Sequence, residues 1–190
     1  MYSVAMTLKR LALLLPMFGI AAAQATAGPV AIAPDSLEVS VAVKATMHSF
    51  TATVAGGELA VTGDAATRTI ESAHYKFPWS GVTTGNKKRD VEMLEWVRAD
   101  EHPDGVFTLK AIETRPAGTV ATGTLEFHGN SREIGFPVTI EPAGNGLCIS
   151  GEATLDHREW GLKQFRKLGL LSVNPTVTVT FKFETAERSD

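Results

Sequence analysis

The sequence lacks the second cysteine that a disulfide requires, because Cys148 is its single cysteine. A chain with one thiol has no internal disulfide, so its stability has to come from secondary structure and an apolar core. Basic side chains are also few, with 18 Lys and Arg against 21 Asp and Glu and no basic run. Such a mildly acidic chain argues against binding to nucleic acid, or to an anionic membrane surface, by bulk charge.

Sequence signatures of catalysis and of metal binding are absent as well. There is no Gly-x-Ser-x-Gly nucleophile elbow, and the adjacent carboxylates Asp100 and Glu101 fall in a predicted surface loop. The five histidines are His48, His74, His102, His128 and His157. None of their spacings is the i,i+2 or i,i+4 of a local metal site, although a site assembled across strands stays open. We therefore expect no enzyme, no metal and no cofactor, and we assign the histidines to structural hydrogen bonds.

One long apolar run is present, at the N-terminus, and it is too short to span a membrane. Lys9 and Arg10 precede an apolar run of about 13 residues, whereas a membrane helix needs roughly 20. Two A-x-A cleavage patterns follow, ending at Ala25 and Ala27. We expect a cleavable signal peptide at 1–27, export to the periplasm, and no membrane span in the mature form.

Two-residue alternation of apolar and polar side chains is abundant in the remaining chain. Val39, Val41 and Val43 alternate with polar residues, and turn signals such as Gly56-Gly57 separate the alternating segments. The predicted strands cover 39–47, 49–55, 59–62, 68–77, 105–115, 125–128, 134–140, 147–155 and 176–183. This pattern predicts eight or nine strands, with one helix at 87–98.

Each predicted strand has one apolar and one polar face, which is typical of an antiparallel sheet with one solvated side. About eight such strands close as a sandwich or as a barrel, and a barrel of this size can hold a ligand. An outer-membrane barrel has the same periodicity with the faces reversed. We disfavour it because the aromatic residues are not gathered into girdles and a helix interrupts the strands. The segment 28–35 is predicted to be a loose N-terminal lead.

The predicted helix at 87–98 has an unusual beginning. Asn86 is a suitable N-cap, yet Lys87, Lys88 and Arg89 fill the first turn, where the helix dipole favours anions. Two interpretations stay open. The cations are solvated, which we favour because lysines usually face water, or they bind an anionic ligand head group.

Several segments in a fixed order resemble the YceI-like family. They are Met47-His48-Ser49-Phe50, Thr84-Gly85-Asn86 with Arg89-Asp90, Ala99 to Pro103 with Phe107, Gly123 to Gly129 before Arg132, and Leu155 to Gly161. The resemblance extends over about 36–184. It implies an exported protein with an extended, lipocalin-like antiparallel β-barrel of about eight strands, which binds a polyisoprenoid in its lumen and is not an enzyme. We accordingly expect a β-barrel domain at 36–186 that holds such a lipid for transport, storage or stress response.

Three sets of residues are candidates for the site. The inward apolar faces predict ligand contacts from Val41, Val43, Phe50, Trp79, Leu94, Phe107, Phe127, Phe136, Val138, Val179 and Phe181. The possible head-group residues are Lys87, Lys88 and Arg89. A structural role is assigned to the motif residues Thr84, Gly85, Asn86, Arg89, Asp90, Pro103, His128, Gly129 and Arg158, with Asp90 paired to a cation such as Arg89, Arg98 or Arg158. Alternation identifies a face rather than a cavity, so a packed core is the alternative for each apolar residue.

A different class of function also fits the sequence. The chain could encode a periplasmic protein–protein interaction module with a packed lumen and an exposed apolar patch on the outer face of the strands. The sequence leaves open which lipid is bound and whether the domain forms a homodimer.

Overall fold

The computed structural model describes residues 28–30, 36–46, 48–64, 67–144, 146–167 and 171–185. The predicted signal peptide at 1–27 and residues 31–35 of the predicted lead lie outside this range. The strands are β1 (Gly28–Val30), β2 (Glu38–Ala45), β3 (Phe50–Val54), β4 (Glu58–Asp64), β5 (Thr69–Pro78), β6 (Val82–Thr83), β7 (Asp104–Arg115), β8 (Gly118–Phe127), β9 (Asn130–Ala143), β10 (Gly146–Asp156), β11 (Arg166–Lys167) and β12 (Leu171–Glu184). The helices are α1 (Lys87–Val97) and the short 3-10 helices η1 (Trp79–Gly81) and η2 (His157–Trp160). No helix in the described part of the chain has the length and apolarity needed to cross a membrane.

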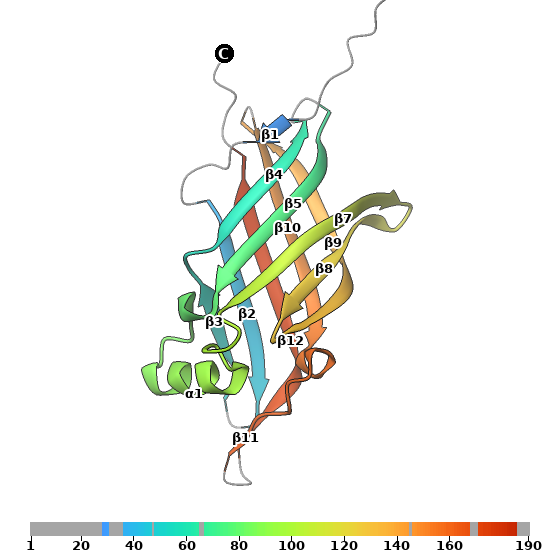
Figure 1. Ribbon diagram of the computed structural model, residues 1–190. Coiled ribbons are helices and arrows are strands. Elements are labelled where there is room, and N and C mark those ends of the chain that lie inside the picture. Colours follow the sequence, from blue (N-terminus) through green and yellow to red (C-terminus); the bar gives the residue numbers. More distant parts are fainter. Residues whose placement is uncertain are drawn as a thin grey trace, which may run out of the picture.

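The strands form one antiparallel sheet that curls strongly around a central space (Figure 1). Its hydrogen-bonded order is β1-β4-β5-β7-β8-β9-β10-β12-β2-β3-β6, and β11 pairs with β12. In the described residues β1, β6 and β11 have three residues or fewer, which leaves nine longer strands. The predicted antiparallel, barrel-like fold with a single inserted α-helix is confirmed, and the two ends of the curled sheet are β1 and β6.

The two-residue strands β6 and β11 and the first residues of β12 were not predicted, and two further segments differ from the sequence-based prediction. β8 begins at Gly118, whereas the alternation predicted a strand at 125–128. Its first half carries small residues such as Ala121 and Gly123, which give a weak periodic signal, yet it pairs with β7 and β9 along its whole length. The first three residues of the predicted loose lead form β1, which pairs with β4. Short pairing of this kind depends on an available strand edge, which local sequence does not reveal.

The buried apolar side chains form two clusters. The wall cluster lies along the strands and consists of Val61, Ala121, Phe136, Val138, Leu147, Ile149, Ala153 and Phe183. The base cluster consists of Val97, Leu125, Phe127, Trp160 and Leu162. The base cluster draws on α1 and η2, which lie at the end of the molecule opposite β1 (Figure 1).

Candidate ligand cavity

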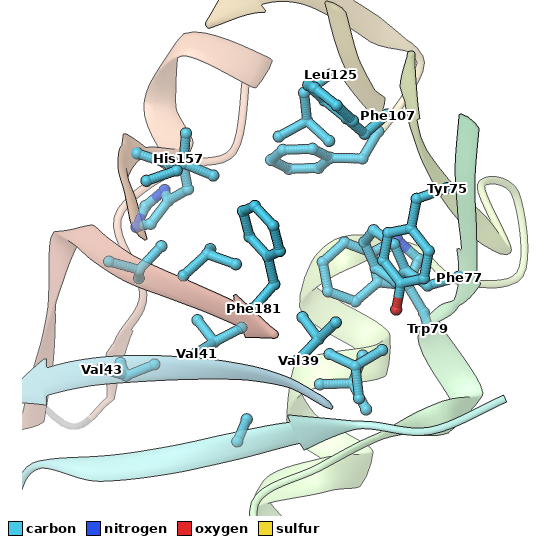
Figure 2. Close-up of a pocket in the computed structure, with 18 of the residues that line it drawn as sticks. Val39, Val41, Val43, Tyr75, Phe77, Trp79, Phe107, Leu125, His157 and Phe181 are labelled. Carbon is cyan, nitrogen blue, oxygen red and sulfur yellow. The ribbon is translucent and has the colours of Figure 1, made fainter. Parts of the chain in front are cut away.

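A cavity of about 630 Å³ lies inside the curled sheet. Side chains from all nine longer strands, from α1 and from η2 line it, and nearly all of them are apolar. Figure 2 shows Val41 of β2, Phe107 of β7 and Phe181 of β12 directed into this shared space. A surface with few hydrogen-bonding groups suits an apolar ligand, because such a ligand has no hydrogen-bonding groups of its own to satisfy.

Ten of the eleven predicted contact residues line the cavity. They are Val41, Val43, Phe50, Trp79, Phe107, Phe127, Phe136, Val138, Val179 and Phe181. Leu94 is the exception and does not line it. On α1 the residues that face the cavity include Arg89, Met93 and Trp96, which follow the helical repeat, and Leu94 is turned about 100° from Met93. Contact with a ligand stays a prediction for all ten.

Tyr75 and Phe77 of β5 also line the cavity, and the prediction omitted them. Their rings stack with centroids 5.8 Å apart, and Phe77 contacts Trp79 edge to face at 5.4 Å (Figure 2). Burial raises the pKa of Tyr75 to about 12. The alternation of Ala73, Tyr75 and Phe77 with polar residues was a signal that could have identified this face.

The polar residues that line the cavity gather mainly at its α1 end. Most lie in the chain around the start of this helix or opposite it: His48, Thr84, Asn86, Lys88, Arg89 and Glu92. Of the three predicted head-group cations, Lys88 and Arg89 therefore line the cavity and Lys87 does not. This distribution gives an otherwise apolar cavity one polar end.

The junction before α1 is held by side chains of its own motif. The Asn86 side chain accepts hydrogen bonds from the backbone N–H groups of Lys88 (3.1 Å) and Arg89 (3.2 Å), as an N-cap does. Asp90 accepts hydrogen bonds from the Thr84 hydroxyl, the Thr84 backbone N–H and the Thr83 hydroxyl. The Thr84 hydroxyl bond is the main reason that the pKa of Asp90 lies below its ordinary value.

The predicted direct ion pair of Asp90 is replaced by an indirect link. Arg98 pairs with Glu101 and Arg158 with Asp156, so neither is available to Asp90. Arg89 instead donates from Nε to the Thr84 hydroxyl (2.8 Å) and from Nη2 to the Thr84 carbonyl (3.1 Å). Thr84 is therefore hydrogen-bonded to both Asp90 and Arg89.

These contacts reduce the capacity of the start of α1 to bind an anion. Two of its N–H groups are already bound by Asn86, and the Arg89 guanidinium lies 3.9 Å over the Phe50 ring as well as on Thr84. Arg89 therefore has a positioning role at the junction. Lys88, which is exposed and lines the cavity, is the better placed of the three cations to meet a charged ligand group.

His157 is the most deeply buried polar residue of the cavity lining, at 5% exposure. Its ring meets Trp96 edge to face at 4.8 Å. Neither ring nitrogen has a hydrogen-bond partner of normal geometry among the described residues, although the neighbouring Leu162 backbone favours the protonated form. Burial lowers the pKa of His157 nevertheless. The expected structural hydrogen bond is therefore not found at His157.

The other histidines do not form a metal centre in the described part of the chain. His74 Nδ1 lies 3.3 Å from the Thr108 hydroxyl on the outer surface, which fits a structural hydrogen bond. The rings of His102 and His128 lie 5.3 Å apart, without a third ligand. No group of three or more His, Cys, Asp or Glu suitable for a metal occurs among the described residues.

The remaining motif residues organise turns. His128 and Gly129 both have positive φ, 50° and 69°, as a tight hairpin turn between β8 and β9 requires. The Pro103 carbonyl accepts a 2.8 Å hydrogen bond from the Trp79 backbone N–H. Their assigned role as structural residues fits these contacts.

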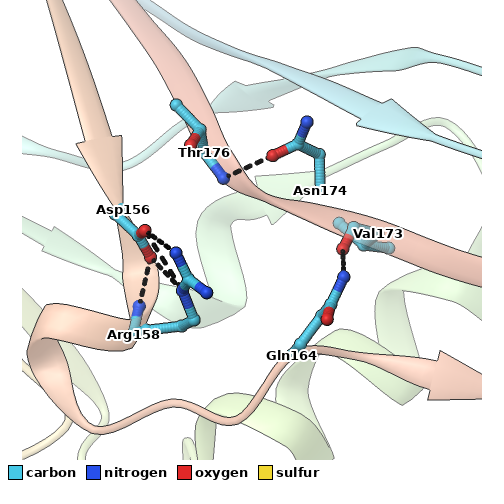
Figure 3. Close-up of polar contacts among 6 residues, drawn as sticks. All are labelled: Asp156, Arg158, Gln164, Val173, Asn174 and Thr176. Carbon is cyan, nitrogen blue, oxygen red and sulfur yellow. Dashed lines mark hydrogen bonds and ion pairs between the residues drawn. The ribbon is translucent and has the colours of Figure 1, made fainter.

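Arg158 closes the start of η2 by binding Asp156 through its backbone N–H (3.0 Å) and its Nε (2.9 Å), as Figure 3 shows. These bonds hold the pKa of Asp156 at about 2. Because Arg158 is largely exposed, water screens the pair and its contribution to stability is small.

β12 changes register between Val173 and Val177. The irregular segment is bound by Gln164, whose Nε2 donates to the Val173 carbonyl (3.1 Å), and by Asn174, whose Oδ1 accepts from the Thr176 N–H (2.9 Å; Figure 3). Past this bulge, Val177, Val179 and Phe181 all face the cavity. Val173, before this segment, lines the cavity as well, so the register shift of two residues keeps the same alternate positions of β12 facing inward.

Comparison with known proteins identifies relatives of this fold. The sequence matches the YceI-like domain over residues 30–185. Burkholderia cenocepacia BcnA superposes with a TM-score of 0.68 at 18% identity, over 79% of this chain and 96% of its own. A Campylobacter jejuni YCEI protein gives 0.59 at 17% identity, over 73% and 85%.

A polyisoprenoid binding domain from Saccharophagus degradans, implicated in plant cell wall breakdown, gives a TM-score of 0.61 at 14% identity, over 84% of this chain and 99% of its own. Identities this low establish a shared fold and no more. A search of curated protein sequences returns no significant match.

Proposed function

The chain belongs to the YceI-like family, and from this premise we propose that it binds a polyisoprenoid, or a similar long apolar lipid, inside the curled sheet. The observation that carries the proposal is the cavity of about 630 Å³ with an almost entirely apolar lining. The Saccharophagus degradans relative is a polyisoprenoid binding domain, which supports the same ligand class.

The energetics favour such a ligand. Burial of roughly 300 Å² of lipid tail, at about 25 cal/mol per Å², contributes about 7–8 kcal/mol before the costs of ordering the chain. An isoprenoid tail has no hydrogen-bonding groups, so its transfer into the cavity leaves no polar atom unpaired. The apolar lining therefore supports retention of such a lipid.

The lipid would enter with its tail along the strands and its polar end beside α1. The mainly α1-end location of the polar lining residues supports this orientation. Lys88, exposed at that end, would meet a phosphate head by charge, and a neutral head would rely on the tail contacts.

The proposal includes a cellular setting. The predicted signal peptide supports export to the periplasm, where the protein would transport or store the lipid or act in a stress response. The sequence contains no nucleophile elbow, which supports a binding protein rather than an enzyme.

The interaction-module alternative requires an exposed apolar patch and a packed lumen. Among the described residues Val91 is the one large apolar side chain that is exposed, and it lies on α1 rather than on the strands. The space inside the sheet is also a cavity of about 630 Å³ rather than a packed lumen. Both observations favour the lipid-binding function.

Native mass spectrometry of the protein purified from its own periplasm, followed by lipid extraction, tests the proposal. We expect a bound mass of an isoprenoid lipid in stoichiometric amount. Protein recovered with no lipid, which also takes up no added octaprenol or octaprenyl pyrophosphate, would contradict it.

A change of Lys88 to Gln tests the head-group position and leaves Arg89 in its contacts with Thr84 and Phe50. We expect octaprenyl pyrophosphate to bind about five- to tenfold more weakly and with less salt dependence, because a cation at the cavity end is removed. Binding of the uncharged octaprenol should not change. Lys87→Gln is the matched control, since this residue does not line the cavity. Equal weakening of both ligands would place the head group elsewhere.

A further inference from the structure

Four aromatic side chains of the cavity lie directly over glycines of the sheet. A Cβ atom built on Gly105 would fall 2.3 Å from the Phe77 ring, and one on Gly57 would fall 2.5 Å from the Tyr75 ring. The same relation holds for Gly123 with Phe107 (2.5 Å) and for Gly151 with Phe181 (2.7 Å). Real Cβ atoms essentially never approach so closely, so each ring occupies the space that a side chain would need.

Strand register produces these pairs. Phe77 and Gly105 are direct partners of β5 and β7, and Phe181 and Gly151 are direct partners of β12 and β10. Gly123 of β8 and Phe107 of β7 are diagonal neighbours, and Gly57 lies just before β4, diagonal to Tyr75 of β5. All four rings line the cavity while none of the four glycines does, so the rings cover the glycines on the inner face.

A ring that lies over a glycine rests against the sheet and projects less into the space inside it. With any larger residue opposite, the ring would have to turn inward, where it would fill part of the cavity. The glycines therefore explain why a sheet with so many inward aromatic residues still encloses about 630 Å³.

The cavity is elongated. Its lining includes β12 residues from Val173 to Phe183, a distance along the strand of about 33 Å at about 3.3 Å per residue. The rings of all four pairs border this space, so their positions set its width. A flexible hydrocarbon chain adapts to a bore that such rings narrow, whereas a rigid fused-ring skeleton does not.

We infer that these glycine–aromatic pairs determine the bore of the cavity, and that they make the protein selective for a single-chain lipid over a fused-ring lipid. The inference rests on the proposed lipid-binding function and adds the residues that set its specificity. Gly105 and Gly57 are the residues of choice for a test, because the three nearest atoms to their added Cβ all belong to one aromatic side chain, Phe77 or Tyr75. At Gly123 and Gly151 a Cβ would also meet backbone oxygens.

The experiment compares Gly105→Ala with Gly135→Ala, using octaprenol and cholesterol as probes and tryptophan fluorescence as the readout. Gly135 is the matched control, because it is an exposed strand glycine whose added Cβ would meet nothing closer than 3.5 Å. We expect the wild-type protein to bind octaprenol and to reject cholesterol. Gly105→Ala should weaken octaprenol binding at least about tenfold, and Gly135→Ala by less than about twofold.

Phe77→Ala in the Gly105→Ala background removes the ring that the new methyl group displaces. Octaprenol affinity should return to within about threefold of wild type, and Phe77→Ala alone should bind cholesterol measurably. Circular dichroism checks that each variant is folded. A crystal structure of Gly105→Ala should show the Phe77 ring turned into the cavity.

Unchanged octaprenol affinity in Gly105→Ala, or a Phe77 ring that stays at the wall in its crystal structure, would overturn the inference. Cholesterol bound by the wild type as tightly as octaprenol would overturn it too. If the wild type binds neither lipid, the proposed function is contradicted. The position of the Phe77 ring in the Gly105→Ala structure then still decides whether Gly105 determines the width of the cavity.

Discussion

The wall cluster and the base cluster use similar residues in different ways. In the base cluster Trp160 is fully buried and Val97 is 1% exposed, and neither lines the cavity. Phe127 stacks on Trp160 with ring centroids 4.8 Å apart, and Trp160 Nε1 donates to the Leu125 carbonyl (2.9 Å). The wall cluster instead has many half-buried neighbours, such as Phe107 and Phe181, that border the cavity.

This difference shows how a small apolar sheet can be both stable and hollow. In the base cluster Trp160 and Val97 are packed on all sides and supply stability without lining the cavity, whereas Leu125, Phe127 and Leu162 of the same cluster border it. The wall side chains give up contacts on their cavity side, which costs dispersion energy that a ligand can restore. Stability and binding are therefore concentrated in different parts of the same core.

The strongest test of the comparison is Trp160→Ala. We expect a loss of about 3–5 kcal/mol in unfolding free energy, because the change removes a fully buried ring and leaves the Leu125 carbonyl without its donor. Urea denaturation followed by circular dichroism measures it. A loss below about 1 kcal/mol would show that the base cluster does not supply the stability.

Phe181→Ala in the wall should cost less, about 1–2 kcal/mol in unfolding free energy, because the ring already borders a cavity. Its effect on octaprenol retention, measured by native mass spectrometry, should be larger than that of Val97→Ala, because Val97 belongs to the base cluster and does not line the cavity. If Phe181→Ala destabilised the protein as much as Trp160→Ala, the two clusters would not differ in function.

Acidification should reduce stability through His157, which is buried, and His128, which is partly buried. The pKa of His157 is lowered from its ordinary value of 6.5 by burial, and that of His128 shifts downward for the same reason. The unfolded chain therefore binds protons that the folded chain does not, so stability present above about pH 6.5 is lost as the pH falls toward the folded pKa values.

We expect a lower Tm at pH 5.5 than at pH 7.5, by roughly 2–4 °C for each kcal/mol lost. His157→Phe should reduce this difference, and the exposed His74→Phe should leave it unchanged. Asp156, with a pKa of about 2, loses its contribution only at much lower pH. An identical pH dependence in His157→Phe and wild type would exclude His157 as the source.

The smallest expected effect is that of chelation. A structural metal would contribute several kcal/mol to folding, so its removal would lower the Tm clearly. We expect EDTA to leave the Tm of the purified protein unchanged. A clear decrease would show that the histidines, including the His102 and His128 pair, do hold a metal.

Much of the fold could be predicted because its signals are local. A side-chain period of two identifies a strand and its inward face, which placed Val41, Phe136 and Phe181 on the correct side of the sheet. Asn86 likewise marked the start of α1, because an N-cap needs a side-chain acceptor at that position. β1 and the first half of β8 lacked such a local signal and were missed.

The sequence by itself determined most of the longer strands and which side of each is apolar, since both properties depend on neighbours along the chain. Only the tertiary structure decided that these faces enclose a cavity, that Leu94 turns away from it, and that the ring of Phe77 lies over Gly105. The physical reason is that an enclosed volume depends on strand register and on the curl of the whole sheet. Those features arise from contacts between residues far apart in the sequence, which no local pattern records.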